Sequence, residues 1–219
     1  MDFNTGTGGT GSSGGSSAGP GGSPRGAQSA AAAEFRYTDP VPTFISTVRS
    51  VVTAPVDFFR GILRQGDLVN PLIFGLICYE IYTILGGLLR LVGIGADMGF
   101  GSFIVSLVLA PIFAAIGLFI GAGILHLLVR LIVGSRNAGF EGTFRVSAYS
   151  SVTLLVSWIP IIGWIASLYG IYLGIVGIRE VHNTTTGKAA LVVLIPAAVL
   201  ILLALILVAI GAALFLSLR

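Results

Sequence analysis

The sequence predicts an all-α fold, a polytopic membrane bundle of five transmembrane helices with short N-terminal amphipathic helices. Between Leu72 and Leu218 the chain carries only ten Asp, Glu, Lys or Arg residues. Ala189–Leu218 has 30 residues without a charge, and Gly101–Val129 has 29 with a single His. A helix of about 20 apolar residues crosses a hydrocarbon layer of roughly 30 Å. Since lipid offers no hydrogen-bond partner to an open backbone, we expect these runs to be helices.

The overall composition excludes several classes of protein. The chain is 55% hydrophobic and only 10% charged, and its mean hydropathy is +0.98, whereas soluble domains are about a quarter charged. The basic residues form no dense stripe, so we expect no nucleic-acid partner. Cys78 is the single cysteine and no zinc-type spacing occurs, so we expect neither disulfide, metal nor cofactor. We also expect no catalytic residues and no enzymatic activity, because hydrolase motifs and paired intramembrane carboxylates are missing from the sequence.

The first 34 residues form a compositionally distinct region. They are rich in Gly, Ser, Thr and Ala and contain almost no large apolar side chain. Such a segment cannot bury enough surface to offset its conformational entropy. We therefore expect residues 1–34 to be a disordered tail, more naturally a solvated linker than a docking site.

Residues 35–69 are predicted to form two amphipathic helices, each too short and too charged to cross a membrane. The first carries apolar residues at helical spacing after Asp39-Pro40-Val41-Pro42. The second begins near Pro55, with Phe58 and Phe59 on one face and Arg60 and Arg64 on the other. Helices of this kind often lie in the membrane interface. Packing on the ends of the transmembrane bundle is an equally good placement, and the two are compatible.

Residues 70–219 contain the five predicted spans. The expected ranges are 72–92, 102–133, 146–159, 161–178 and 190–218. Asn70 and Pro71 suit the N-cap and the first position of the first span. Pro111 should kink the long second span, and Pro160 separates the short third and fourth spans.

The distribution of charge predicts the orientation. One side of the predicted bundle carries most of the basic residues, namely Arg36, Arg49, Arg60, Arg64, Arg136, Arg145, Arg179 and Lys188. The other side carries the loop with Asp97, the uncharged Pro160 turn and Arg219. The positive-inside rule then places the N-terminus in the cytoplasm and the C-terminus outside, which needs an odd number of spans. Trp158 and Trp164 flank the outer turn, as in an aromatic belt.

Three stretches of the chain resemble the Yip1 domain family. The most specific is Gly139-Phe140-Glu141-Gly142-Thr143-Phe144-Arg145-Val146-Ser147-Ala148-Tyr149-Ser150, continuing to Ile159-Pro160-Ile161-Ile162-Gly163-Trp164. Pro55-Val56-Asp57-Phe58-Phe59 through Pro71-Leu72 resembles the entry segment of that domain, and Gly177-Ile178-Arg179-Glu180-Val181-His182 resembles its end. The likeness covers about residues 42–215. It implies five spans with a cytosolic N-terminus, in agreement with the charge distribution.

The resemblance also bears on partners and location. Eukaryotic relatives are associated with Rab GTPases and early secretory traffic, but the Gly/Ser tail replaces their longer polar N-terminal region. We therefore do not expect a Rab-type partner. One Lys among twelve basic residues, with abundant Ala and Gly, indicates a GC-rich and prokaryotic genome. The expected location is the prokaryotic cell membrane, or the Golgi or ER membrane if the chain is eukaryotic.

Glu80, His126 and Arg130 form the strongest polar constellation in the predicted spans. Glu80 lies about 12 Å into the first span from its cytosolic end, and His126 and Arg130 share one face of the second span at similar depth. Ionisable residues within a membrane are costly and usually face a partner or a water-filled cavity. The cluster is either a proton or ion relay, or an internal ion pair that fixes helix rotation. The second interpretation is favoured because no further acidic residue lines the presumed path.

Small residues follow two of the predicted spans as continuous seams. They are Gly163, Ser167, Gly170, Gly174 and Gly177 in the fourth span, and Gly117 and Gly121 in the second. Such seams let helix backbones approach closely where lipid supplies no hydrophobic drive. Packing within the chain is favoured over dimerisation, because a short central span needs neighbours.

The sequence therefore predicts a non-enzymatic membrane protein of Yip1 type. Its expected role is to organise the membrane or to bind partners, which would be the lipid bilayer, other membrane proteins or another copy of itself. The alternative is a small transporter or channel component that uses Glu80, His126 and Arg130.

Overall fold

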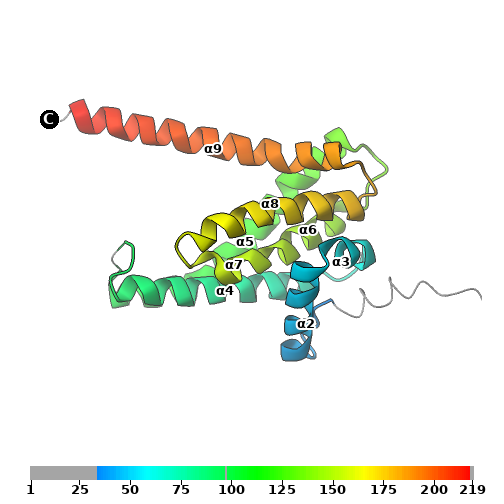
Figure 1. The fold of residues 1–219 in the computed structure, drawn as a ribbon, viewed down its shortest axis with the longest axis horizontal. Coiled ribbons are helices and arrows are strands. Elements are labelled where there is room, and N and C mark those ends of the chain that lie inside the picture. The colour runs from blue at the N-terminus through cyan, green and yellow to red at the C-terminus, as the bar shows by residue number, and fades with distance from the viewer. Residues whose placement is uncertain (1–33, 97, 218–219) are drawn as a thin grey trace, which may run out of the picture.

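The computed structural model describes residues 34–96 and 98–217, and every regular element in them is a helix (Figure 1). The elements are α2 (Pro40–Thr53), α3 (Pro55–Gly61), α4 (Val69–Leu91), α5 (Phe100–Ile132), α6 (Gly139–Ser150), the 3₁₀ turn η1 (Ser151–Thr153), α7 (Leu154–Ser157), α8 (Ile162–Val181) and α9 (Thr186–Ser217). The prediction of an all-α fold is confirmed for this part of the chain. The predicted tail lies outside the described residues, except for Glu34.

In the described part of the chain, four helices are long and apolar enough to cross a membrane, namely α4, α5, α8 and α9. Five spans were predicted, so the structure does not confirm that count. The predicted third span is instead the broken sequence α6, η1 and α7. Its first half is polar, with Glu141 and Arg145, and the 3₁₀ turn interrupts the helix. The segment still leads from one end of the bundle to the other, because α8 starts at the far end and returns (Figure 1).

The two ends of the bundle differ in their residues. We call the end that holds α3, the loop 133–138 and the loop 182–185 the basic end, because Arg60, Arg64, Arg136 and Arg179 lie there. The opposite end holds the loop after α4, the turn between α7 and α8, and the end of α9 (Figure 1). Asp97 and Arg219, which were used to predict the orientation, lie outside the described residues.

The core is built around α6, which contacts α4, α5 and α8. Phe144, Val146 and Tyr149 are at most 1% exposed. The ring of Tyr149 packs against Phe58 of α3, with centroids 5.1 Å apart, and against Phe74 of α4 at 5.3 Å. The apolar face of α3 is therefore buried, and Phe58 and Phe59 pack on the bundle.

The start of α4 differs in detail from the sequence-based expectation. The helix begins at Val69, and Asn70 is not its N-cap. The carboxylate of Asp67 accepts the amide hydrogens of Val69 at 2.8 Å and Asn70 at 3.2 Å. The side-chain oxygen of Asn70 instead accepts the Tyr37 amide at 2.9 Å. Asp67 rather than Asn70 therefore supplies the side-chain oxygen at the start of this helix, and both residue types are suited to that role.

Helix α9 packs on the bundle only through its first turns. Ala189 and Val192 are fully buried, whereas all residues from 198 to 217 are exposed. Figure 1 shows α9 diverging from α8 towards the opposite end. The outer part of α9 is apolar throughout, so its surroundings in a membrane are expected to be lipid.

Candidate functional site

The α6 helix carries a buried ion pair at the basic end. Arg145 Nη1 donates to Glu34 Oε2 at 2.8 Å, and the two side chains are 3% and 8% exposed. The same carboxylate oxygen accepts the Tyr149 hydroxyl at 3.0 Å, while Glu34 Oε1 accepts the Leu63 amide at 2.7 Å. Arg145 Nη2 donates to the Asp67 carbonyl at 2.7 Å. We call Glu34, Arg145 and Tyr149 the buried lock.

The buried lock joins three separate parts of the chain, which are the segment before α2, the connection between α3 and α4, and α6. Burial raises the pKa of Glu34, and the Leu63 amide and the Arg145 charge oppose that rise. Glu34 was assigned to the predicted tail, and the structure corrects that boundary, because the residue is 6% exposed. Phe35 beside it is 1% exposed. The low-complexity composition of the preceding residues hid this contact from sequence reasoning.

A second polar network meets α6 at Thr143, two residues before Arg145. Thr143 Oγ1 lies 3.0 Å from His126 Nδ1 of α5 and 3.1 Å from His182 Nε2 at the end of α8. The Ala138 amide donates to His182 Nδ1 at 3.1 Å. His182 therefore carries its proton on Nε2 and donates it to Thr143, whose hydroxyl can in turn donate to His126. This assignment of protons gives every hydrogen bond of the network one donor and one acceptor.

His182 is held in its neutral form. Its side chain is buried, and its pKa is lowered to about 4 by burial and by the charges of His126 and Arg64. Protonation at Nδ1 would also break the hydrogen bond from Ala138. At neutral pH the network is therefore a set of hydrogen bonds that ties α5, α6 and α8 together, and it carries no charge at His182.

The structure does not bring Glu80, His126 and Arg130 together. His126 is hydrogen-bonded to Thr143, and Arg130 is exposed. Within residues 34–96 and 98–217, neither Glu80 nor Arg130 forms an ion pair, and Glu80 Oε2 is buried without a hydrogen-bond partner. Equal depth on antiparallel helices thus did not produce a hydrogen bond or ion pair between Glu80 and the other two side chains in the described residues. A functional role for these residues stays a prediction.

The small residues of α8 lie against other parts of the same chain. A Cβ atom added at Gly177 would lie 2.5 Å from a methyl group of Val146, and one at Gly163 would lie 2.5 Å from the Ser157 carbonyl. Looser contacts, at 3.4 Å, join Gly170 to Thr153 and Gly174 to Val193 of α9. Ser167 is exposed and donates to its own helix, at the Gly163 carbonyl. The glycines of the seam on α8 therefore lie against other segments of this chain, whereas Ser167 does not.

The small residues of α5 behave differently. A Cβ atom at Gly117 or Gly121 would meet no atom within 4 Å. Both line a hollow of about 370 Å³ that also touches α6, α8 and the start of α9. This part of the seam is thus not used in packing within the described chain.

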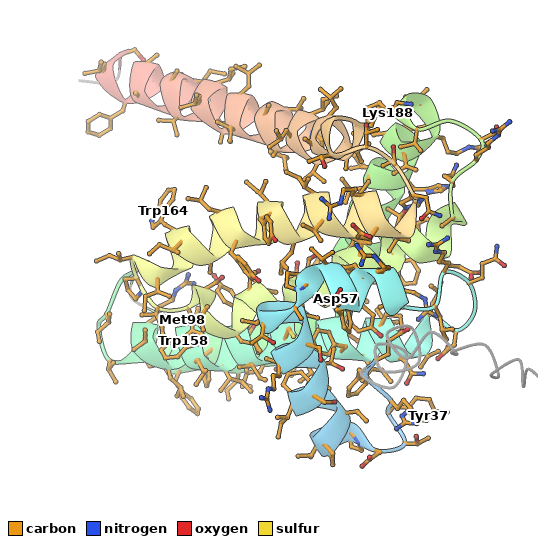
Figure 2. The ribbon with its side chains drawn as sticks, turned by 45° about the vertical axis from the view of Figure 1, so that its right-hand side comes forward. Tyr37, Asp57, Met98, Trp158, Trp164 and Lys188 are labelled. Carbon is orange, nitrogen blue, oxygen red and sulfur yellow. The ribbon has the colours of Figure 1, made fainter. Side chains whose placement is uncertain are left out.

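The predicted interfacial residues take several positions. Arg60 forms an ion pair with Glu180 at 3.0 Å, and Arg64 Nη2 donates to Asn183 at 3.1 Å. Trp158 and Trp164 lie at the opposite end (Figure 2). Trp158 is half-buried and donates to the Leu155 carbonyl at 2.7 Å, whereas Trp164 is 81% exposed. An exposed indole at a helix end is typical of the membrane–water boundary.

The residues that sequence reasoning missed are Glu34, Thr143 and His182. Thr143 and His182 lie within the stretches that carry the family resemblance, but both were treated as ordinary loop or helix-end residues. The signal available in the sequence was that Thr143 lies close to Arg145, and His182 close to Arg179, each at the border of an apolar span. No group of three or more His, Cys, Asp or Glu residues suited to a metal ion occurs in the described part of the chain.

Comparison with known families agrees with this architecture. The model of the Yip1 domain matches residues 49–208, well over half of the 219 residues. The match includes α6 with Arg145 and Tyr149, and all three residues of the histidine–threonine network. No curated protein and no solved structure matches the chain. The extent of the family match shows that the chain belongs to the Yip1 domain family.

Proposed function

We propose that this protein is a non-enzymatic membrane scaffold that organises the membrane or binds partner proteins at its basic end. The buried lock is the observation that carries the proposal. Apart from Arg145 Nε, which is buried without a hydrogen-bond partner, its polar groups bind one another and the backbone, and so they hold α3 and the segment before α2 on the bundle. The Yip1 family is generally one of non-enzymatic membrane proteins, which supports the same conclusion.

The lock gives α2 a fixed place beside the membrane-spanning helices. Thr43 and Thr47 of α2 face inward, whereas Val41 and Ile45 are 67% and 61% exposed. An amphipathic helix with such a face is suited to the membrane interface or to the apolar surface of a partner.

The protein is proposed to lie in a prokaryotic cell membrane with its basic end in the cytoplasm. The concentration of arginines at that end supports this orientation. Single cysteines at Ser135, Gly187 and Gly95, introduced in a Cys78→Ala background, would test it. Ser135→Cys and Gly187→Cys should react only with reagents that reach the cytoplasm, and Gly95→Cys should react from outside. The reverse pattern, or labelling of all three from one side, would contradict the proposal.

Site-specific crosslinking tests the scaffold role. A photoreactive residue at Ile45, on the exposed face of α2, should capture one or a few defined partners in native membranes. The same group at Val199, on the exposed part of α9, is the control and should capture mainly lipid. Identical products at both positions, identified by mass spectrometry, would argue against a partner surface at the basic end.

The alternative function is a small transporter or channel component. The unpartnered Glu80 Oε2 in a candidate span is the observation that favours it. Reconstituted protein would then mediate an ion or solute flux in proteoliposomes that Glu80→Gln abolishes. Absence of flux, together with specific crosslinked partners, would favour the scaffold.

A further inference from the structure

A polar cavity of about 410 Å³ opens between three loops of the basic end. The loop after α3 contributes Arg64, the loop after α5 contributes Arg136 and Asn137, and the loop after α8 contributes Asn183. These loops meet at the right of the bundle in Figure 1. Residues far apart in the sequence, with Gln65 beside Arg64, therefore place two guanidinium groups and three side-chain amide groups around one space.

The positive charge of this cavity is not neutralised by the described residues. No carboxylate from residues 34–96 or 98–217 lines it. The acidic residues near it in sequence are engaged elsewhere, since Glu141 accepts the Gly66 amide and Glu180 pairs with Arg60 and Arg179. Arg64 donates one hydrogen bond to Asn183. No ion pair involves Arg64 or Arg136 in the described residues.

The charge of Arg64 also acts on His182. It forms part of the cavity wall, and the charge of Arg64 is one of the causes that lower its pKa to about 4, after burial and the charge of His126. The positive charge of Arg64 therefore reaches the wall of the cavity. An anion in the cavity would be attracted.

We propose that this cavity is a binding site for a phosphate group, held by Arg64 and Arg136 from two different loops. Guanidinium groups offer paired N–H donors that match the oxygens of phosphate, and the amide groups can add neutral hydrogen bonds. The inference does not depend on the scaffold role proposed above.

The phosphate could belong to an anionic lipid headgroup or to a soluble phosphate compound. The cavity lies at the ends of membrane-spanning helices, where basic pockets commonly accept lipid headgroups. Leu63 on its rim is 57% exposed and could contact an acyl chain or glycerol backbone. A soluble ligand would make no use of that apolar rim, so the two sources can be separated by affinity.

Calorimetric titration of the full-length protein in an uncharged detergent provides the test. The probes are dihexanoyl phosphatidylglycerol, dihexanoyl phosphatidylcholine as the zwitterionic lipid, and inorganic phosphate. Arg64→Gln and Arg136→Gln remove the two charges, and Arg49→Gln is the matched control because Arg49 is exposed on α2 outside the cavity. Thermal unfolding without a probe shows whether each variant is folded. Arg136 makes no described hydrogen bond, so Arg136→Gln alone decides if Arg64→Gln fails to fold.

Each cavity variant should weaken binding of an anionic probe about tenfold or more, since a hydrogen bond to a charged group is lost. Arg49→Gln should change the affinity less than about twofold. Tight binding of phosphatidylglycerol with weak binding of free phosphate would identify a lipid headgroup, and similar affinities would identify a soluble phosphate. The proposal is overturned if the parent protein binds neither anionic probe at millimolar concentration, or if Arg49→Gln weakens binding as much as the cavity variants do.

Discussion

The basic end of the bundle and the outer part of α9 are assembled by different forces. At the basic end, polar side chains are buried and specifically paired, as in the lock of Glu34, Arg145 and Tyr149. Beyond residue 198, α9 is uniformly apolar and exposed. Lipid chains are as apolar as leucine, so apolar surface alone does not hold membrane helices together. The contrast indicates that polar contacts and close packing near the basic end determine how the helices assemble.

Breaking the lock should produce the largest loss of stability. Arg145→Met or Glu34→Ala leaves one buried charge or polar group without its partner, which costs about 3–5 kcal/mol for a buried pair. Unfolding of the purified protein in detergent would measure the loss. The control is Arg60→Ala, which removes an ion pair whose arginine is 61% exposed and should cost less than about 1 kcal/mol.

A double-mutant cycle sharpens this result. In the Glu34→Ala background, Arg145→Met should cost less than it does in the parent, because the unpaired charge has already been created. Equal losses in both backgrounds would show that the two residues act independently and that the lock is not a unit.

Acidification should weaken the basic end through His182. Its pKa is about 4 in the folded protein and about 6.5 when unfolded, so the unfolded chain binds the extra proton first. The contribution of neutral His182 to the free energy of unfolding is therefore complete above about pH 6.5. It is lost as the pH falls towards 4, and the loss reaches up to about 3 kcal/mol. His182→Asn retains an acceptor for the Ala138 amide but does not titrate. The parent should lose more stability than His182→Asn over this range, and parallel pH curves would contradict the prediction.

Close packing on α8 should be more sensitive to an added methyl group than the seam on α5. Gly177→Ala places a Cβ atom 2.5 Å from a Val146 methyl group, whereas Gly121→Ala meets no atom within 4 Å. We expect a loss of about 1–3 kcal/mol for Gly177→Ala and almost none for Gly121→Ala. Thermal unfolding of the two variants gives the comparison. A large loss for Gly121→Ala would show that another molecule packs on α5.

The apolar helices could be predicted from sequence, and the contacts between them could not. Runs of apolar residues gave α4, α5, α8 and α9 with boundaries within a few residues, because the length of a membrane span depends on the bilayer. The break between α6 and α7 was missed, since a 3₁₀ turn leaves no strong mark in an apolar and serine-rich sequence. The Glu34–Arg145 pair spans 111 residues, and nothing local to either residue indicates the other. The Glu80 cluster was expected from similar depth and from the helix face that His126 and Arg130 share, but neither feature determines whether side chains on different helices form an ion pair.

The smallest effect should come from one substitution made at two positions of α9. Val192 is fully buried and Val199 is 58% exposed, so Val192→Ala and Val199→Ala remove the same atoms from packed and unpacked surroundings. Val192→Ala should cost about 1 kcal/mol through lost contacts, and Val199→Ala should remain within about 0.5 kcal/mol of the parent. Detergent replaces lipid around Val199 without changing its packing, so the comparison can be made by unfolding in micelles and repeated in nanodiscs. Equal losses at both positions would mean that the outer part of α9 is covered by protein, most simply by a second copy. The contrast between the basic end and α9 would then hold only for the single chain.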